Sequence, residues 1–218
     1  MPPNNSTLSA TGIVRSVNVS GVCSVEIDGH AVTTGIFKVP VVGRVPLRGV
    51  NLRGDDQADR NAHGGTDRAL YAYAAEDYDW WAGELSRTLT AGTFGENLTL
   101  RGVDVSGARI GERWRVGSTL LDVTSPRVPC FKLAHVMTDP GFVRSFARAL
   151  RPGAYLRVLE EGAIAVGDVV EVVDRPNHKL TTAEMARIFF FDRKRVRDML
   201  VAADLPDSWR DWAMEHSP

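Results

Sequence analysis

Short apolar and β-branched runs dominate the chain as far as about residue 174, and glycine, proline or the turn pair Asp28 and Gly29 separate them. Such runs, bounded by turn residues, are typical of strands, and many short strands at close spacing indicate a curved sheet or barrel. The predicted strands lie at residues 13–19, 24–27, 69–73, 98–100, 112–116, 120–124, 155–159 and 169–173.

Helical spacing of apolar residues is limited to a few segments. Tyr78, Trp81 and Leu85 recur at i, i+3 and i+7, which predicts an amphipathic helix over residues 75–86 with its aromatic side chains in the core. A further helical stretch is expected at residues 142–150.

The composition changes after Pro176. Residues 181–184 (Thr-Thr-Ala-Glu) have the form of a capping box, and three short helical patterns follow, at residues 182–190, 193–203 and 207–215. We therefore expect a mainly β domain with some helix (α+β) over residues 11–174 and a three-helix extension over residues 178–218.

Composition excludes several classes of protein. The chain has 218 residues and a formal net charge of -1, so nothing points to binding of a nucleic acid polymer or of an anionic membrane surface. The start lacks a signal-peptide pattern and no apolar run reaches membrane-spanning length, which favours a cytoplasmic protein. Cys23 and Cys130 are too far apart for a CxxC pair.

Cys130 lies in a setting that is typical of a reactive thiol. Pro126 and Pro129 keep helix out of the segment before it, so the cysteine is expected at a stiff corner between a strand and a helix. Arg127 and Lys132 flank it, and neighbouring positive charge favours the thiolate. A small buried thiol with no chemical role is the alternative that these residues leave open.

Three loops combine glycines with charged residues: 54–68, 92–97 and 125–132. Successive backbone amides in such loops form concave sites for phosphate or another oxo-anion. The nearby cations are Lys38, Arg127, Lys132 and Arg157. Each loop alone also fits an ordinary solvated turn, but their co-occurrence favours a site for a phosphorylated cofactor. The chain has no GxxxxGK[ST], HExxH or GxSxG pattern and no GxGxxG after a strand.

Five motifs in a fixed order closely resemble the MOSC domain, which is named after the C-terminal part of molybdenum cofactor sulfurase. The motifs are Gly54-Asp55-x-Gln57-Ala58-Asp59, His63-Gly64-Gly65, Gly92-Thr93-Phe94-Gly95-Glu96-Asn97-Leu98, Ser125-Pro126-Arg127-x-Pro129-Cys130-x-Lys132-Leu133 and Gly153-x-Tyr155-x-Arg157-Val158. The C-terminal helices resemble the extension of the YiiM-like branch of this family, so the resemblance covers nearly the whole chain.

The resemblance implies a barrel-like domain that binds the molybdenum cofactor, a molybdopterin whose dithiolene sulfurs hold the metal. Cys130 occupies the place of the protein ligand to molybdenum, and a thiolate suits a sulfur-rich metal centre. The implied cofactor-binding residues are Lys38, His63, Gly64, Gly65, Thr93, Phe94, Gly95, Glu96, Asn97, Arg127, Lys132 and Arg157.

The resemblance also implies an oxidoreductase that reduces N-hydroxylated compounds, such as hydroxylaminopurines, to amines. The reaction is R–NHOH plus two electrons and two protons, giving R–NH2 and water. The proton-donor candidates are His63, Asp55 and Asp59, with histidine favoured because it titrates near neutral pH. No flavin, haem or iron–sulfur motif is visible, so separate electron-donor proteins are the expected partners, and a homodimer is possible.

Two other readings stay open from the sequence. One is a carrier that holds the cofactor, or sulfur as a persulfide on Cys130, without turning over a small-molecule substrate. The other is a hydrolase that uses Cys130 and His63 as nucleophile and base. The family is also associated with pyridoxal phosphate, for which Lys38 and Lys132 are the candidate Schiff-base lysines, with little further support.

Overall fold

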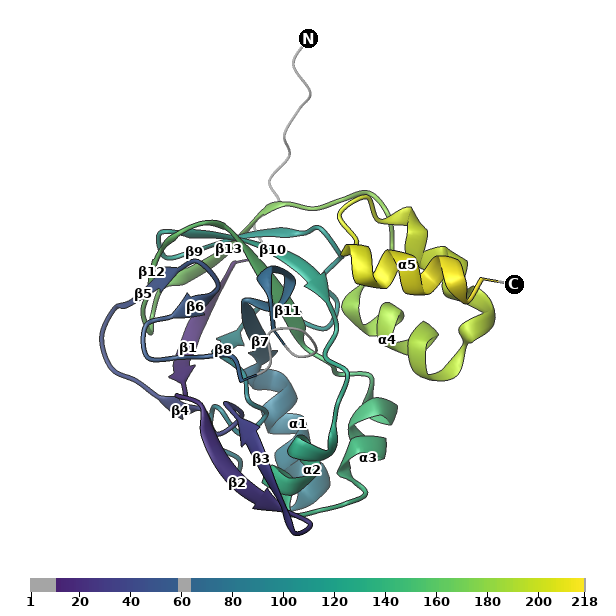
Figure 1. The fold of residues 1–218 in the computed structure, drawn as a ribbon. Helices are drawn as coiled ribbons and strands as arrows, with labels where there is room; N and C mark the ends of the chain where they lie inside the picture. Colours follow the sequence, from purple (N-terminus) through teal and green to yellow (C-terminus); the bar gives the residue numbers. More distant parts are fainter. Residues whose placement is uncertain (1–10, 59–63, 218) are drawn as a thin grey trace.

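Seven strands of the described residues close into a barrel (Figure 1). The computed structural model describes residues 11–58 and 64–217. The strands follow one another in the order β13, β9, β10, β11, β7, β8 and β1, and antiparallel pairing of β1 with β13 closes the ring. Their bounds are β1 Thr11–Val19, β7 Leu70–Ala74, β8 Leu98–Arg101, β9 Arg113–Val116, β10 Thr119–Ser125, β11 Ala154–Glu160 and β13 Val169–Asp174.

Alternation of side chains explains why these segments form a barrel. Trp114 and Val116 of β9 and Val170 and Val172 of β13 are buried, while the residues between them are more exposed. Successive side chains of a strand point to opposite faces, so one face of each strand fills the barrel interior. The predicted mainly β fold with additional helices is confirmed.

Smaller strands surround the barrel. β2 (Cys23–Ile27) and β3 (His30–Thr34) form a hairpin, and β4 (Val39–Pro40) pairs with β1. β5 (Val45–Arg48) pairs with both β6 (Asn51–Leu52) and β12 (Gly162–Ile164). The hairpin turns at Asp28 and Gly29, which both have positive φ, as the Asp-Gly pair predicts.

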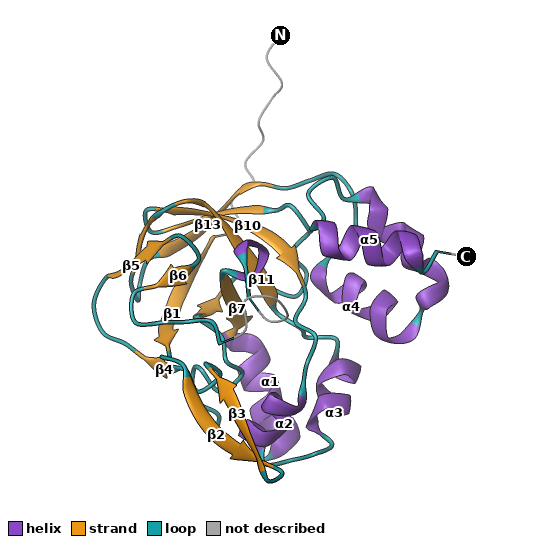
Figure 2. Cartoon of the chain, viewed as in Figure 1, coloured by secondary structure: helices purple, strands orange, loops and turns teal. Residues whose placement is uncertain are grey.

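Three helices pack together beside the barrel (Figure 2): α1 (Ala75–Leu85), α2 (Phe131–Met137) and α3 (Phe142–Ala149). A 3₁₀ turn, η1 (Thr66–Arg68), precedes β7. Between these helices lies a second apolar cluster in which Phe94 contacts the rings of Tyr73, Trp81 and Phe142. The ring of Phe94 therefore anchors the 92–97 loop in the aromatic core.

The C-terminal segment contains α4 (Thr182–Phe191), η2 (Arg193–Val201) and α5 (Asp207–Glu215). The Thr181 hydroxyl accepts a hydrogen bond from the Glu184 amide at 3.1 Å, so the predicted cap is present. The helical segment expected at residues 193–203 is present as a 3₁₀ helix. Val196 and Met199 are its buried residues, and their i, i+3 spacing fits three residues per turn.

The C-terminal helices and the barrel share one apolar core. Met185, Ile188 and Met199 belong to the same cluster as Ile110 and Trp114 of the barrel domain. The division into residues 11–174 and 178–218 stays a prediction. Within the described part of the chain, every helix is too short or too polar to cross a membrane.

Candidate functional site

Segments distant in sequence meet around an open cleft with an enclosed volume of about 110 Å³. They are the β3–β4 connection, the loop after β6, the 92–97 loop, the β10–α2 loop and the faces of β7 and β11 that point away from the barrel interior. The described lining residues are Thr34, Gly35, Ile36, Lys38, Asp55, Asp56, Gln57, Ala58, Arg68, Ala69, Tyr71, Gly95, Asn97, Arg127, Cys130, Lys132 and Tyr155. All three loops singled out in the sequence contribute to this cleft.

The structure describes thirteen of the fifteen predicted site residues and brings seven of them together at the cleft. Seven of them line the cleft: Lys38, Asp55, Gly95, Asn97, Arg127, Cys130 and Lys132. Phe94 and Glu96 are fully buried and do not line it. Asp59 and His63 lie outside the described residues, so their candidate roles stay predictions.

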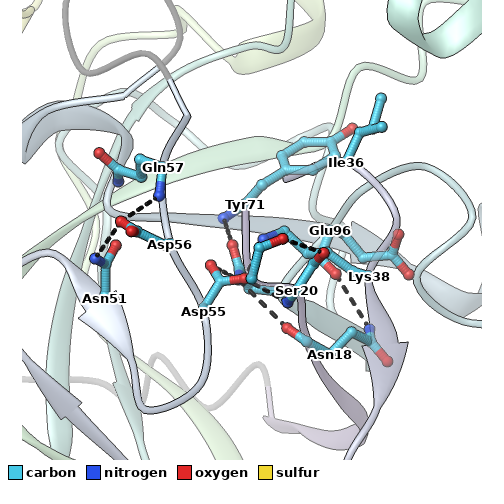
Figure 3. A network of polar contacts seen from close by, with 12 residues as sticks. Asn18, Ser20, Ile36, Lys38, Asn51, Asp55, Asp56, Gln57, Tyr71 and Glu96 are labelled. Atoms are coloured by element: carbon cyan, nitrogen blue, oxygen red, sulfur yellow. Dashed lines mark hydrogen bonds and ion pairs between the residues drawn. The ribbon is translucent and has the colours of Figure 1, made fainter. Parts of the chain in front are cut away.

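Asp55 connects three segments through hydrogen bonds (Figure 3). Its Oδ1 accepts from the Ser20 amide at 2.8 Å and from the Lys38 ammonium at 2.5 Å, while its Oδ2 accepts from the Asn97 side-chain amide at 2.8 Å. Burial lowers the pKa of Lys38, and the charge of Asp55 opposes this shift. Asp55 thus fixes Lys38 and Asn97 at the cleft wall, while its role as a proton donor stays a prediction.

The buried side chain of Glu96 stabilises the 92–97 loop. Its Oε1 accepts hydrogen bonds from the Gly92 amide, the Tyr78 hydroxyl and the Thr99 hydroxyl, each at 2.7 Å. Burial raises the pKa of the Glu96 carboxyl, and these hydrogen bonds oppose the shift. Gly95 has a φ of 70°, and a Cβ there would lie 2.9 Å from Ile36 Cγ1 and 3.3 Å from Arg127 Nη1. Glycine is therefore needed where this loop approaches the cleft.

Replacing Glu96 with alanine is expected to lower the free energy of unfolding by roughly 3 kcal/mol, because three buried donors lose their acceptor. Glu96→Gln keeps an acceptor oxygen and removes the cost of burying a charge, so its change is expected to stay within about 1 kcal/mol. Urea unfolding of both variants measures the difference. Equal losses in the two variants would show that the charge, and not the hydrogen bonds, stabilises the loop.

Arg127 is a buried cation whose hydrogen bonding is incomplete. It is 7% exposed, its Nη1 donates to the Phe94 carbonyl at 2.6 Å, and its guanidinium lies 5.0 Å from the centre of the Tyr71 ring. Its Nε has no hydrogen-bond partner among the described residues, and no carboxylate among them forms an ion pair with it. Burial opposes the charge of Arg127, and Glu96 and Cys130 favour it without a close ion pair, so an anion in the cleft would offset more of the cost of burial.

Cys130 lies at the corner that the two prolines predict. β10 ends at Ser125, the chain stays extended through Cys130 (φ −131°, ψ 174°), and α2 begins at Phe131. The cysteine is half-buried and lines the cleft, and it does not form a disulfide with the exposed Cys23. The position of Cys130 therefore favours a thiol that faces a basic cleft over an inert thiol in the core.

The other predicted cofactor-binding residues do not line the cleft. Thr93 donates a hydrogen bond to the Thr90 carbonyl at 2.6 Å. Gly64 is half-buried, and the Gly65 amide donates to Oε1 of Gln57, which itself lines the cleft. Arg157 pairs with Asp67 at 2.7 Å and with Asp122 at 3.5 Å. Through these two ion pairs Arg157 connects η1 to β10 in the barrel wall beside the cleft.

Asp122→Asn is expected to stabilise the protein by about 2 kcal/mol at pH 7. Burial raises the pKa of Asp122 to about 6 against a partial opposing effect of Arg157, and its Oδ1 has no partner among the described residues. Because the pKa of Asp122 is higher in the folded protein than in the unfolded chain, the protonated carboxyl stabilises the folded state below about pH 4. This stabilisation is lost as the pH rises through 6. Thermal unfolding of both proteins at pH 4 and pH 7 tests this. A gain that is equal at the two pH values would contradict it.

Sequence reasoning missed several lining residues, including Tyr71, Tyr155, Arg68 and Gln57. Tyr71 and Tyr155 stand in apolar segments that predict strands, so the sequence alone indicates core positions for them. Their rings lie 5.2 Å apart, and Arg68 lies 5.7 Å from the Tyr155 ring centre. The available signal was that Gln57 and Tyr155 stand inside two of the five quoted motifs.

The donor set of the cleft suits an anion with one soft ligand. Lys38, Arg68, Arg127 and Lys132 supply positive charge, and Cys130 supplies a thiol. Among the residues that the structure describes, no three His, Cys, Asp or Glu side chains gather in a way that would hold a metal ion. A metal here would need most of its ligands from a bound group, with Cys130 as the protein's contribution.

Comparison with known proteins gives one family. The sequence pattern of the MOSC domain matches residues 59–171. The uncharacterized protein YflK of Bacillus subtilis is 36% identical over 200 residues, which is 90% of each chain. Protein YiiM of Escherichia coli is 33% identical over 182 residues, or 81% of each chain. A protein of Gibberella moniliformis named reductase is 32% identical over 73% of this chain but only 29% of its own length.

Solved structures with the same fold include two YiiM proteins. YiiM from Geobacillus stearothermophilus superposes with a TM-score of 0.78 at 31% identity, covering 95% of this chain and all of the other. YiiM from Escherichia coli gives a TM-score of 0.69 at 29% identity, over 81% of this chain and 86% of the other. The likeness to the Geobacillus protein extends over barrel and C-terminal helices alike.

Proposed function

Because this chain belongs to the MOSC domain family, in its YiiM-like branch, we propose that it is a molybdenum-cofactor-dependent oxidoreductase that reduces N-hydroxylated compounds to amines. The observation that carries the proposal is the cleft itself, where the Cys130 thiol and the incompletely hydrogen-bonded Arg127 face the same space. The reductase named among the relatives agrees with redox chemistry.

The described residues fit the cofactor. A pterin phosphate would give Arg127 a direct anionic partner and an acceptor for its Nε, and its oxygens suit the planar donors of that side chain. Lys132, whose ammonium donates to the Thr33 carbonyl at 3.0 Å, adds a second cation at the rim. The enclosed part of the cleft, about 110 Å³, has room for a phosphate group, and the remainder of a larger ligand would lie in its open part.

When bound, the cofactor would supply the two-electron redox chemistry and the site at which the N–O oxygen is taken up. Cys130 would anchor the metal from the β10–α2 corner, where two prolines limit backbone movement. Lys38 holds a proton on Nζ beside Asp55, and its lowered pKa makes that proton easier to donate than that of an ordinary lysine. Asp59 and His63 remain the other candidate donors, together with Asp55.

The proposed reaction consumes two electrons and two protons for each R–NHOH, and releases R–NH2 and water. The protein's own side chains do not supply the electrons, so we propose separate electron-donor proteins as partners. A homodimer and a cytoplasmic location are further parts of the proposal that the sequence suggested.

Protein from a host that makes the cofactor tests the proposal. Purified protein is expected to contain molybdenum and pterin in equal amounts and to reduce 6-hydroxylaminopurine with electrons from a donor protein or a chemical reductant. Molybdenum without turnover would support the alternative function, a carrier of cofactor or sulfur. Metal-independent hydrolysis that iodoacetamide blocks would overturn both in favour of the cysteine hydrolase.

A further inference from the structure

A second cavity, of about 360 Å³, adjoins Cys130. One wall is the β10–α2 loop, with Pro126, Val128 and Pro129, and the other is formed by α4 and α5. In Figure 2 these C-terminal helices lie beside the segment that leads from β10 to α2. The volume falls within the range of roughly 300–1,000 Å³ found for small-molecule sites.

The two cavities meet at shared residues. Arg68, Cys130 and Tyr155 line both of them. The cleft carries charged and amide side chains, whereas the second cavity is mostly apolar. Cys130 therefore separates a compartment that suits an anionic cofactor from one that suits an uncharged, flat group.

Aromatic side chains of the C-terminal helices form the far wall. The ring centre of Phe189 lies 5.1 Å from that of Trp212 and 5.3 Å from that of Trp209. Trp209 is 7% exposed and its Nε1 has no hydrogen-bond partner among the described residues. The aromatic side chains of this wall give the cavity an apolar surface on which a flat ring can pack.

We propose that this second cavity binds the planar, nitrogen-bearing aromatic ring of the substrate, with its N-hydroxyamino group directed toward Cys130. The inference rests on the proposed reductase function and adds to it that the C-terminal helices select the substrate. A planar aromatic ring matches the apolar aromatic wall of this cavity. An aliphatic N-hydroxy compound has no flat ring to pack there, so the cavity discriminates against it.

Trp212→Leu tests this selection, because leucine keeps the apolar contact and removes the large aromatic face. We expect KM for 6-hydroxylaminopurine to rise about 10-fold, the effect of losing one base-stacking contact, with kcat changed little. Turnover of hydroxylamine, which has no ring, and the molybdenum and pterin contents should stay within about twofold. Trp80→Leu, the same change in α1 away from both cavities, is the matched control.

A binding measurement separates this inference from the reductase function. Adenine, the amine that corresponds to 6-hydroxylaminopurine, is titrated calorimetrically into purified protein, with Ser208→Phe as a second variant. Ser208 is exposed and lines the cavity, so phenylalanine there fills the space without disturbing the core. Both variants should weaken adenine binding at least about 10-fold relative to the unmodified chain.

The outcomes are distinct. Adenine binding that depends on the cavity, without any reduction of 6-hydroxylaminopurine, would overturn the reductase function and support the ring site. Adenine binding that neither variant affects would overturn the inference. So would an unchanged KM for the purine accompanied by a raised KM for the electron-donor protein, since the aromatic wall would then be a docking surface for that protein.

Discussion

Cys130→Ser is expected to reduce turnover of 6-hydroxylaminopurine by more than about 100-fold, equivalent to roughly 2.7 kcal/mol of transition-state free energy. A serine oxygen is a harder and far less acidic ligand than a thiol, so it is a poor substitute at a sulfur-rich metal. The cysteine is half-buried and serine has nearly the same shape, so the free energy of unfolding should change by less than about 1 kcal/mol.

Cys23→Ser is the matched control for that experiment. Cys23 is exposed in β2 and does not line the cleft, so its replacement should leave turnover and metal content unchanged. X-ray absorption of the loaded proteins adds a direct measurement, because loss of one sulfur neighbour at molybdenum should occur in Cys130→Ser alone. Full turnover in Cys130→Ser would remove the thiol from the mechanism.

Arg127→Met is expected to lower cofactor affinity about 10- to 100-fold, the loss that follows removal of a charge-assisted hydrogen bond. The cofactor-free protein should unfold at nearly the same or a slightly higher denaturant concentration. Methionine leaves the Phe94 carbonyl without its 2.6 Å donor, but it also removes a buried cation whose Nε has no hydrogen-bond partner among the described residues.

Arg44→Met is the control, since Arg44 pairs with Asp168 on the surface and its side chain is 54% exposed. Cofactor content is measured by extraction of pterin and molybdenum, and stability by urea unfolding of the cofactor-free protein. Normal loading of Arg127→Met together with a stability loss of several kcal/mol would make Arg127 a structural residue that holds Phe94 in place, and the anion site would have to lie elsewhere.

The sequence was informative about the cleft where local rules apply. Pro126 and Pro129 restrict the backbone on their own, so the corner at Cys130 was visible without the fold. Gly95 belongs to a glycine loop that the sequence singled out as a candidate anion site, and the structure adds that a Cβ there would meet Ile36 and Arg127. Such features depend on a few neighbouring residues, and they led to the right loops.

Strand register was the part that the sequence did not reveal. Tyr155 and Arg157 lie on one face of β11 because they are two residues apart, yet the tyrosine lines the cleft and the arginine pairs with Asp67 and Asp122. Which of the two reaches the cleft depends on the pairing of Tyr155 with Ser125 and Tyr71 on neighbouring strands. Contacts of that range are set by the closed barrel and not by local spacing.

The pairing of β1 with β13 has a consequence for how the molecule is made. Thr11 lies opposite Glu171, so the seam of the barrel joins segments at opposite ends of the domain. On the ribosome β1 keeps one edge open until β13 has emerged, and an open edge is a template for pairing with another chain. Nascent copies on one messenger thus stay open to strand exchange at this edge until β13 is made, and a slow translation rate before that point would prolong the exposure.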